Sequence, residues 1–346
     1  MAGVFLLAYL LPATHALGLS MGGGWSWFPV AFIFVITPVL DGLLGQDESN
    51  PEPRRRWLYD LCLWAWVPVQ SSLLIWTLGR VGAGTGSGLE LGGWVFSMGL
   101  VAGAGGITVA HELMHRPRQG ERALAEILMT LVSYPHFCVE HVFGHHRNVA
   151  TPLDPATARS GESVYRFLPR TLRGGFMSFW RIEADRVRKH GRRGWADARI
   201  RYALLLVFAY VGVAAGFGAT GVLVFAAQGV VAVLLLEIIN YVEHYGLLRA
   251  TLDEADGRWE RVRPHHSWNS SHRLTNAYLF HLPRHADHHA VASRPYHLLR
   301  HEPEGPQLPA GYATMVLVAL LPPLWFHLMD PRVARAVVER GQAQGT

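Results

Sequence analysis

Long apolar segments constrain the fold of this chain more than any other feature of its sequence. A membrane-spanning helix needs about 20 consecutive apolar residues, and half of the 346 residues are hydrophobic while only 16% are charged. Six apolar segments cover approximately residues 3–20, 25–44, 57–78, 91–114, 203–221 and 222–245. We therefore expect an all-α polytopic membrane protein with six transmembrane helices and a His-rich catalytic part.

The polar segments between these runs predict where that catalytic part lies. Residues 127–139 are apolar but too short to cross a bilayer, so we expect a re-entrant or interfacial helix there. The run 312–328 contains Pro322 and Pro323, and we expect it to lie at the membrane interface. We expect one domain over residues 1–335, with catalytic segments 115–200 and 246–311, and a C-terminal tail over residues 336–346.

Positive charge is distributed unevenly along the chain. No Lys or Arg precedes Arg54, whereas Arg54–Arg56 and residues 116–201 are rich in Arg. By the positive-inside rule these segments are cytoplasmic, which places both termini in the cytoplasm. We expect the membrane to be a bacterial inner (plasma) membrane. Arg interleaved with aromatic residues, as nucleic-acid binding requires, is not evident. With two cysteines and no Cys-x-x-Cys pair, the chain has no thiolate-ligated redox centre of its own.

Nine histidines occur in four short clusters near the ends of apolar segments. These are His111 and His115; His141, His145 and His146; His244; and His285, His288 and His289. Helical residues i and i+4 share a face, so we expect His141 and His145 to point at one centre and His146 at a neighbouring one. Nine imidazoles exceed the ligands of one ion. A pair of ions is predicted, for which iron fits best while zinc and manganese stay possible.

Acidic residues accompany the histidines. Metal-bound imidazoles usually donate their second N–H to a carboxylate, and the candidates for this role are Glu112, Glu140, Asp154, Glu243 and Asp287. Ordinary solvation of a helix end is the alternative for each of them.

The order of the histidine motifs carries a family resemblance. The motifs are H-E-L-M-H (111–115), E-H-V-F-G-H-H (140–146), N-Y-V-E-H-Y-G (240–246) and L-P-R-H-A-D-H-H-A (282–290), with H-H-S-W-N-S-S-H at 265–272. Together they resemble the integral-membrane alkane monooxygenase (AlkB alkane hydroxylase) family, within the membrane fatty-acid-desaturase-like di-iron superfamily. The resemblance covers approximately residues 25–335. It implies that the nine histidines bind two non-haem iron ions, and that no other side chain performs the chemistry.

The resemblance also implies a reaction and its partners. Members hydroxylate the terminal methyl group of medium- to long-chain n-alkanes with O2, using electrons from rubredoxin and rubredoxin reductase, which are separate chains. Met114 and Arg116 also suit the xylene-type aryl-methyl monooxygenases, and a fatty acyl desaturase or hydroxylase is a further alternative. The non-enzymatic alternative is a His-rich membrane metal transporter, although transporters bind ions near the bilayer midplane rather than at helix ends.

Two surfaces are predicted from these roles. A hydrocarbon dissolved in the bilayer needs an apolar tunnel, for which the candidates are Phe28, Phe32, Ile33, Ile36, Leu61, Ala65 and Ile107. Family members often carry a bulky aromatic residue near the position of Ile33, so we expect a deeper tunnel here. Rubredoxins are acidic, and a basic docking surface is predicted at Arg186, Arg188, Lys189, Arg192 and Arg193. Positive-inside topology and lipid contact are the alternative for these five.

Overall fold

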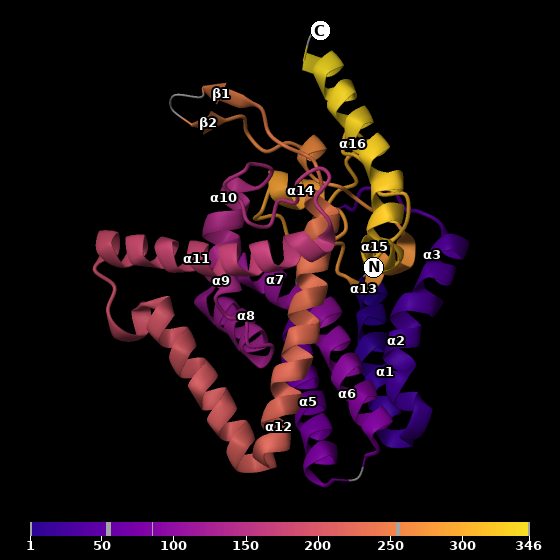
Figure 1. The fold of residues 1–346 in the computed structure, drawn as a ribbon, viewed down its shortest axis with the longest axis vertical. Coiled ribbons are helices and arrows are strands. Elements are labelled where there is room, and N and C mark those ends of the chain that lie inside the picture. The colour runs from indigo at the N-terminus through magenta and orange to yellow at the C-terminus, as the bar shows by residue number, and fades with distance from the viewer. Residues whose placement is uncertain (1, 53–56, 85, 254–256, 345–346) are drawn as a thin grey trace.

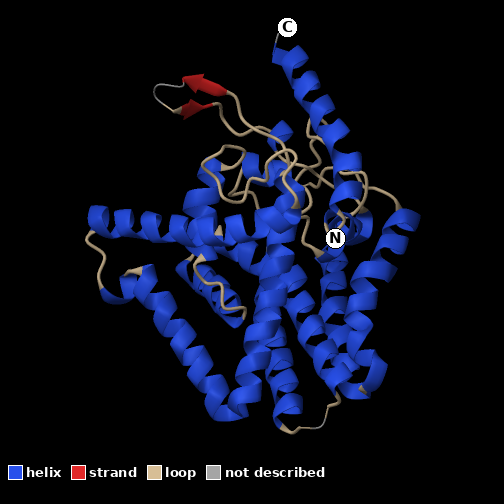
Figure 2. Ribbon diagram, in the orientation of Figure 1, coloured by secondary structure: helices blue, strands red, loops and turns tan. Residues whose placement is uncertain are grey.

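Helices make up most of the computed structural model, which describes residues 2–52, 57–84, 86–253 and 257–344 (Figures 1 and 2). The only strands in that part of the chain, β1 (Thr251–Asp253) and β2 (Arg258–Trp259), form a small antiparallel hairpin. The all-α prediction is therefore confirmed.

Five helical stretches are long and apolar enough to cross a membrane, and they stand side by side in the lower half of Figure 1. The first stretch comprises η1 (Ala2–Tyr9) and α1 (Leu10–Met21), and the second η2 (Gly23–Trp27), α2 (Phe28–Ala31), η3 (Phe32–Ile36) and α3 (Thr37–Leu44). The third comprises α4 (Trp57–Trp64) and α5 (Trp66–Gly82), the fourth α6 (Gly88–Val101), η4 (Ala102–Ile107) and α7 (Thr108–Met114), and the fifth α12 (Ala198–His244). They provide the apolar helices of an integral membrane protein.

The helix α12 contains both of the last two predicted spans. Its 47 residues would extend roughly 70 Å at the rise of an α-helix, more than twice the thickness of a bilayer's hydrocarbon core. Gly218 interrupts it with φ 67° and ψ −168°, a conformation that glycine adopts without a steric penalty. The two limbs of α12 meet at the bottom of Figure 1, where the chain reverses.

The last apolar run forms a broken pair of helices. α15 (Tyr312–Ala319) and α16 (Pro322–Gln344) are bent by 119° with respect to each other. α16 continues beyond residue 335, so the predicted division between domain and tail falls inside a helix. Residues 345–346, and the Arg54–Arg56 run used for the topology prediction, lie outside the described residues.

The remaining helices are α8 (Gln119–Leu131), α9 (Phe137–Glu140), η5 (His141–His145), α10 (His146–Asn148), α11 (Val164–His190), η6 (Gly194–Ala196), η7 (Pro264–His266), α13 (Arg273–Tyr278), α14 (His285–Ala290) and η8 (Tyr296–Leu298). Of these, α10 and α14 lie in the upper half of Figure 1, and α8 lies beside α12. The predicted short apolar helix over 127–139 is therefore divided, because α8 ends at Leu131 and the chain turns before α9.

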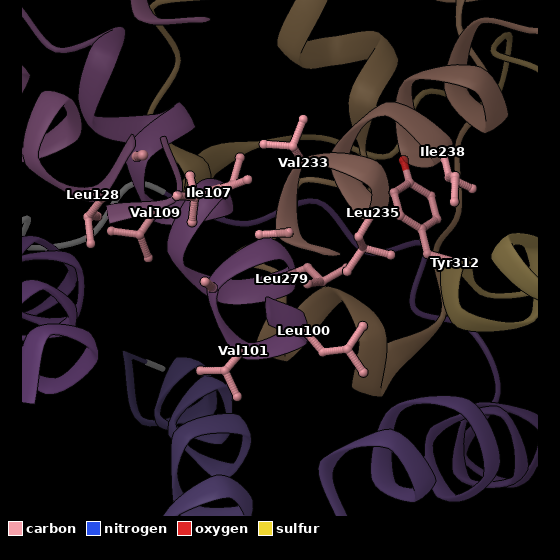
Figure 3. Packing of buried hydrophobic residues seen from close by; sticks show 14 of the residues in the cluster. Leu100, Val101, Ile107, Val109, Leu128, Val233, Leu235, Ile238, Leu279 and Tyr312 are labelled. Carbon is pink, nitrogen blue, oxygen red and sulfur yellow. The ribbon is translucent and has the colours of Figure 1, made fainter. Parts of the chain in front are cut away.

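Close packing fixes the position of the fourth apolar stretch. A β-carbon on Gly105 would overlap the ring of Trp66, and one on Gly106 would overlap the carboxamide of Gln70. Glycine at these positions lets α5 and η4 approach closely, as in other membrane helix pairs. Figure 3 shows Ile107 among the packed apolar side chains of this core. The first histidine cluster follows four residues later and is held by this packing.

Candidate metal centre

The nine clustered histidines come together in two adjacent groups. The five-histidine group consists of His111, His115, His141, His146 and His288. The four-histidine group consists of His145, His244, His285 and His289. Within each group the candidate ligand atoms lie within 4.8 Å of one another. Segments more than 170 residues apart in the sequence, α7 and α14, thus contribute to one site.

The histidines of the cluster 141–146 are distributed between the two groups differently from the sequence prediction. His141 was expected to share a centre with His145, but it lies with His146, and the two Nε2 atoms are 3.0 Å apart. The reason is that η5 is a π-helix (His141–His145), in which residue i is bonded to i+5 rather than i+4. The added residue per turn brings His146 onto the face of His141 and directs His145 to the other group.

In the five-histidine group, imidazole nitrogens face one another at contact distance. Nε2 of His146 lies 3.0 Å from Nε2 of His141 and 3.0 Å from Nε2 of His288. A neutral imidazole has one N–H and one lone pair, so three facing nitrogens cannot all be satisfied by one another. Nε2 of His111 and Nε2 of His115 are buried and have no hydrogen-bond partner among the described residues. A cation between the rings would satisfy these lone pairs, so the residues fit a transition-metal ion.

The four-histidine group has the same character. Nε2 of His289 lies 2.9 Å from Nε2 of His285 and 3.3 Å from Nε2 of His145. Nε2 of His285 lies 3.1 Å from Nε2 of His244. All four side chains are buried. The converging nitrogens again form a donor set suited to one metal ion.

Burial keeps the imidazoles of the five-histidine group neutral. It lowers the pKa of His141, His146 and His288 well below the usual value, and it lowers the pKa of His115 to about 4. A neutral imidazole offers the lone pair that a metal ion requires. The group is therefore in the protonation state for coordination at neutral pH.

Asp154 orients one member of the four-histidine group. Its Oδ2 lies 3.0 Å from Nδ1 of His145 and also accepts a hydrogen bond from Oγ1 of Thr157 at 2.7 Å. Burial by itself lowers the pKa of His145, but the carboxylate outweighs burial and raises this pKa above its usual value. A proton held on Nδ1 leaves Nε2 of His145 directed at His289.

Glu243 contacts the Nε2 side of His285, whereas Asp154 contacts the Nδ1 side of His145. Oε2 of Glu243 is 3.2 Å from Nε2 of His285, and its Oε1 accepts a hydrogen bond from the hydroxyl of Tyr312 at 2.7 Å. Because that Nε2 also faces the other imidazoles, Glu243 stands where the nitrogens converge. Its position suits a direct metal ligand as well as the outer role predicted from the sequence.

The other three predicted carboxylates have different partners. Glu112 forms an ion pair with Arg116 at 2.7 Å, and Glu140 lines a small polar cavity. Oδ2 of Asp287 pairs with Nε of Arg294 at 2.9 Å and accepts a hydrogen bond from the backbone N–H of Arg300 at 2.9 Å, so its role behind an imidazole stays a prediction. Helical neighbours are separated by about 100°, so adjacency in sequence to a histidine does not place a carboxylate against it.

A third cluster has side chains of the types that bind metals, but its contacts are structural. Glu260, His265 and His266 lie close together. The backbone N–H of Arg263 donates to Nδ1 of His266 at 2.9 Å, so the ring's proton is on Nε2 and points to Glu260 at 3.1 Å. Both nitrogens of His266 are engaged, and the arrangement fixes the loop after the β-hairpin.

An apolar cavity opens between the long helices and ends at both histidine groups. It reaches His111 and His141 of the five-histidine group and His285 of the four-histidine group. Its walls come from η3, η4, α12, α13 and α15, and include Ile33, Phe34, Ile107, Leu235, Leu279 and Val316. Apolar walls with few polar groups are typical of a site for a hydrophobic ligand.

Two of the seven predicted tunnel residues line this cavity. They are Ile33 and Ile107, whereas Phe28, Phe32, Ile36, Leu61 and Ala65 are not among its walls. η3 is a π-helix, so the α-helical period assigns the wrong face to residues 32 and 36. The inward positions of α4 are occupied by Cys62 and Leu63, and Leu61 is 50% exposed on the outer face.

The predicted docking residues lie at the end of α11 and in the loop that follows. Arg186 is 2.9 Å from the buried carboxylate of Glu183, Arg192 is 3.8 Å from the same side chain, and Arg188 pairs with Asp185 at 2.9 Å. Lys189 and Arg193 are exposed. Part of the positive charge predicted here is therefore neutralised locally.

Another basic surface lies closer to the histidines. A groove between α10 and α11, which we call the arginine groove, is lined by Arg147, Arg166, Arg170, Arg173 and Arg181 together with apolar side chains such as Phe143. The guanidinium of Arg186 lies 4.1 Å from the Phe143 ring, so this predicted residue sits at the rim of the groove. The sequence analysis missed the groove, although Arg166, Arg170 and Arg173 have the spacing of one helix face.

Comparison with known proteins gives concordant matches over most of the chain. The model of the fatty acid desaturase family matches residues 89–319. The chain is similar to alkane 1-monooxygenase 1 of Pseudomonas aeruginosa, with 48% identity over 89% of this chain and 83% of the relative. It is similar to alkane 1-monooxygenase 2 of Alcanivorax borkumensis, with 42% identity over 95% of this chain and 88% of the relative.

A more distant relative comes from a neighbouring group of enzymes. The hydroxylase component of the xylene/toluene monooxygenase of Pseudomonas putida is 30% identical over 93% of this chain and 86% of the relative. The two kinds of relative differ by 12 to 18 percentage points of identity, that is 42 and 48 against 30.

Proposed function

This chain belongs to the alkane 1-monooxygenase family of integral-membrane oxidoreductases, and we propose that it hydroxylates the terminal methyl group of medium- to long-chain n-alkanes to give primary alcohols. The family assignment makes the chain an enzyme, which removes the metal-transporter alternative. Residues 1–335 form one functional unit in this proposal.

The observation that carries the proposal is the position of the apolar cavity. It extends between helices that an alkane can reach from the bilayer, and it ends beside His111, His141 and His285. A chain lying in it presents one end to both histidine groups. The walls offer an alkane no hydrogen bond, so shape and depth select the substrate.

The nine histidines hold two non-haem iron ions in the proposed enzyme. The converging lone pairs and the buried nitrogens without partners fit a metal ion in each group, and imidazole donors suit iron. When bound, the iron pair supplies the O2 and electron chemistry that no side chain can perform.

The side chains around the centre position these ligands and exclude water. Asp154 fixes the orientation of His145 through Nδ1, as carboxylates do behind metal-bound imidazoles. Tyr312 donates to Glu243 and holds its carboxylate at the end of the apolar cavity. The remaining walls keep water from the reacting methyl group, which prevents side reactions.

Electrons reach the centre from a separate protein, because no thiolate redox site is encoded in the sequence. We assign this role to rubredoxin, reduced by its reductase, and its docking surface to the arginine groove with Arg186, Arg188, Lys189, Arg192 and Arg193 beside it. The groove passes Phe143 and Arg147, which are neighbours of His145 and His146 in the sequence. Complementary charge accelerates association with an acidic partner.

The proposed topology has both termini in the cytoplasm of a bacterium, with the long helices in the inner membrane. In this topology the turns predicted from the sequence at residues 79–88 and 216–221 face outward. The His groups and the arginine groove then face the compartment that contains the electron donor.

Aryl-methyl hydroxylation is the second candidate reaction. The similarity to the xylene/toluene monooxygenase component supports it, because such a substrate requires the same metal chemistry and an apolar cavity. The higher identity to alkane 1-monooxygenases favours n-alkanes.

One purified preparation tests these proposals together. The protein in detergent, supplied with rubredoxin, reductase, NADH and O2, is offered octane, hexadecane and xylene while iron per chain is measured. Two irons and primary alcohols are expected. Methylbenzyl alcohol as the sole product would favour the aryl-methyl reaction, and a desaturated product without alcohol would favour a desaturase.

A further inference from the structure

A second, polar cavity lies beside the four-histidine group, next to the substrate cavity. It is lined by Tyr134, Glu140, His145, Thr171, Glu237 and Asn240, among others. Its free volume is about 10 Å³, which is approximately the room that one water molecule needs. Asn240 and Phe137 line both cavities and so form the wall between them.

Glu237 is the central acid of this polar cavity. It lies on α12, is 2% exposed, and accepts hydrogen bonds from the hydroxyl of Tyr134 at 3.1 Å, the hydroxyl of Thr171 at 2.8 Å and the amide of Asn240 at 3.2 Å. All three donors are neutral, and no Lys or Arg of the described residues forms an ion pair with it. An ionisable group at membrane depth is costly and is typically retained for function.

The cavity places this acid beside the metal centre and beside the arginine groove. His145 forms part of its lining, and so does Pro155, which also lines the arginine groove. Oε1 of Glu140 is buried without a hydrogen-bond partner, which provides a site for a bridging water. The other titratable groups facing the cavity are Tyr134 and His136.

The hydroxylation of an alkane consumes protons at the metal centre. In RH + O2 + 2 e⁻ + 2 H⁺ → ROH + H2O, the external donor supplies both electrons, and both protons join the oxygen atom that leaves as water. The substrate cavity is apolar and provides no route for protons, so they need a separate polar path.

We propose that Glu237 delivers these protons, passing them through the water of the polar cavity to the four-histidine group. Each proton leaves the carboxyl group of Glu237, and the resulting carboxylate is reprotonated from the arginine groove. Tyr134, Thr171 and Asn240 hold the carboxylate in place between transfers. This inference rests on the proposed monooxygenase function.

Infrared spectroscopy of the metal-free protein tests whether Glu237 exchanges protons with water. The wild type is expected to show the C=O band of a buried carboxylic acid, which shifts in D2O faster than the amides of the surrounding helices exchange. The part of the band that belongs to Glu237 is obtained as the difference between wild type and Glu237→Gln, and it should be retained in Glu121→Gln, a matched change of another buried glutamate. A wild-type band that fails to shift, or no such band at the working pH, would overturn the proposal.

Turnover of the iron-loaded enzyme is the second test of the proposal. Glu237→Gln is expected to lose at least about 10-fold in turnover, the lower range for a lost proton donor, with unchanged iron content, unchanged KM for the alkane and a larger solvent isotope effect. Wild-type turnover in this variant would overturn the proposal. If neither the wild type nor Glu121→Gln forms alcohol, the monooxygenase function fails instead, and the infrared result still decides whether Glu237 exchanges.

If Glu237→Gln does not fold, a pair of milder variants still tests the proposal. Thr171→Val removes one donor to Glu237, whereas Thr130→Val removes a buried hydroxyl that bonds only to its own helix at Glu126. A smaller loss of turnover is expected for the first variant alone. Equal losses in both would attribute the effect to stability and contradict the relay.

Discussion

The two histidine groups differ in what surrounds them. Histidines alone supply the converging ligand atoms of both groups, and burial keeps the rings of the five-histidine group neutral. The four-histidine group has two carboxylates against its rings, Asp154 at His145 and Glu243 at His285. Negative charge stabilises a bound cation directly and raises the basicity of the imidazole that it orients. The four-histidine group should therefore bind its ion more tightly, although it has fewer histidines.

Loss of one histidine should have the largest effect and should differ between the groups. His289→Ala leaves three imidazoles in its group, below the usual four ligands, whereas His288→Ala leaves four. We expect His289→Ala to lose one iron per chain and its activity, and His288→Ala to retain more iron with strongly reduced activity. Iron analysis and alcohol formation measure both. Equal iron loss in the two variants would contradict the division of the histidines into these groups.

Removal of metal by a chelator should occur in two stages. The ion of the five-histidine group is expected to leave first, because Asp154 and Glu243 lie against rings of the other group. Activity should disappear with this first ion, since both ions are needed. Iron remaining on the protein is measured against chelator concentration. Simultaneous loss of both ions would show that the carboxylates do not distinguish the groups.

Asp154→Asn sharpens the comparison by removing the charge while keeping the shape. A lost carboxylate behind a metal-bound imidazole typically costs about 10-fold to 100-fold in metal affinity or activity, and we expect that range here. Thr157→Val is the matched control, because it keeps the charge of Asp154 and removes the 2.7 Å hydrogen bond to Asp154 together with the bond that Oγ1 accepts from the backbone N–H of Ala150 at 2.9 Å. Its effect should be smaller. Unchanged iron affinity in Asp154→Asn would contradict the role of the charge.

Ile33→Trp should leave the iron content unchanged and alter only which alkanes are hydroxylated, so its effect is expected to be the smallest. Ile33 lines the apolar cavity, so a larger side chain shortens it, and the longest alkane hydroxylated should become shorter while iron content is unchanged. Leu61→Trp is the control, since Leu61 is half exposed on the outer face of α4. A change of chain-length preference in Leu61→Trp, but not in Ile33→Trp, would contradict the position of the cavity.

The pattern of the sequence was sufficient for the all-α class and for the proximity of the histidines. Apolar length and the positions of His111, His115 and His244 at the ends of long helices are local properties, and they place these rings at one depth. Where the helix departed from its regular period, the prediction failed. The π-helical turns of η3 and η5 displaced Phe32 and Ile36 from the cavity and exchanged the partners of His145 and His146.

The sequence by itself determined a helical membrane protein and predicted imidazole ligands for two metal ions, because length, composition and motif order carry that information. Only the tertiary structure decided which histidine joins which group, which carboxylate touches a ring, and that Glu237 shares a polar cavity with His145. These features depend on contacts between α9, η5, α11, α12 and α14, which are distant in sequence. A contact of this kind follows from helix phase and packing, and a one-residue change of phase is enough to reverse it.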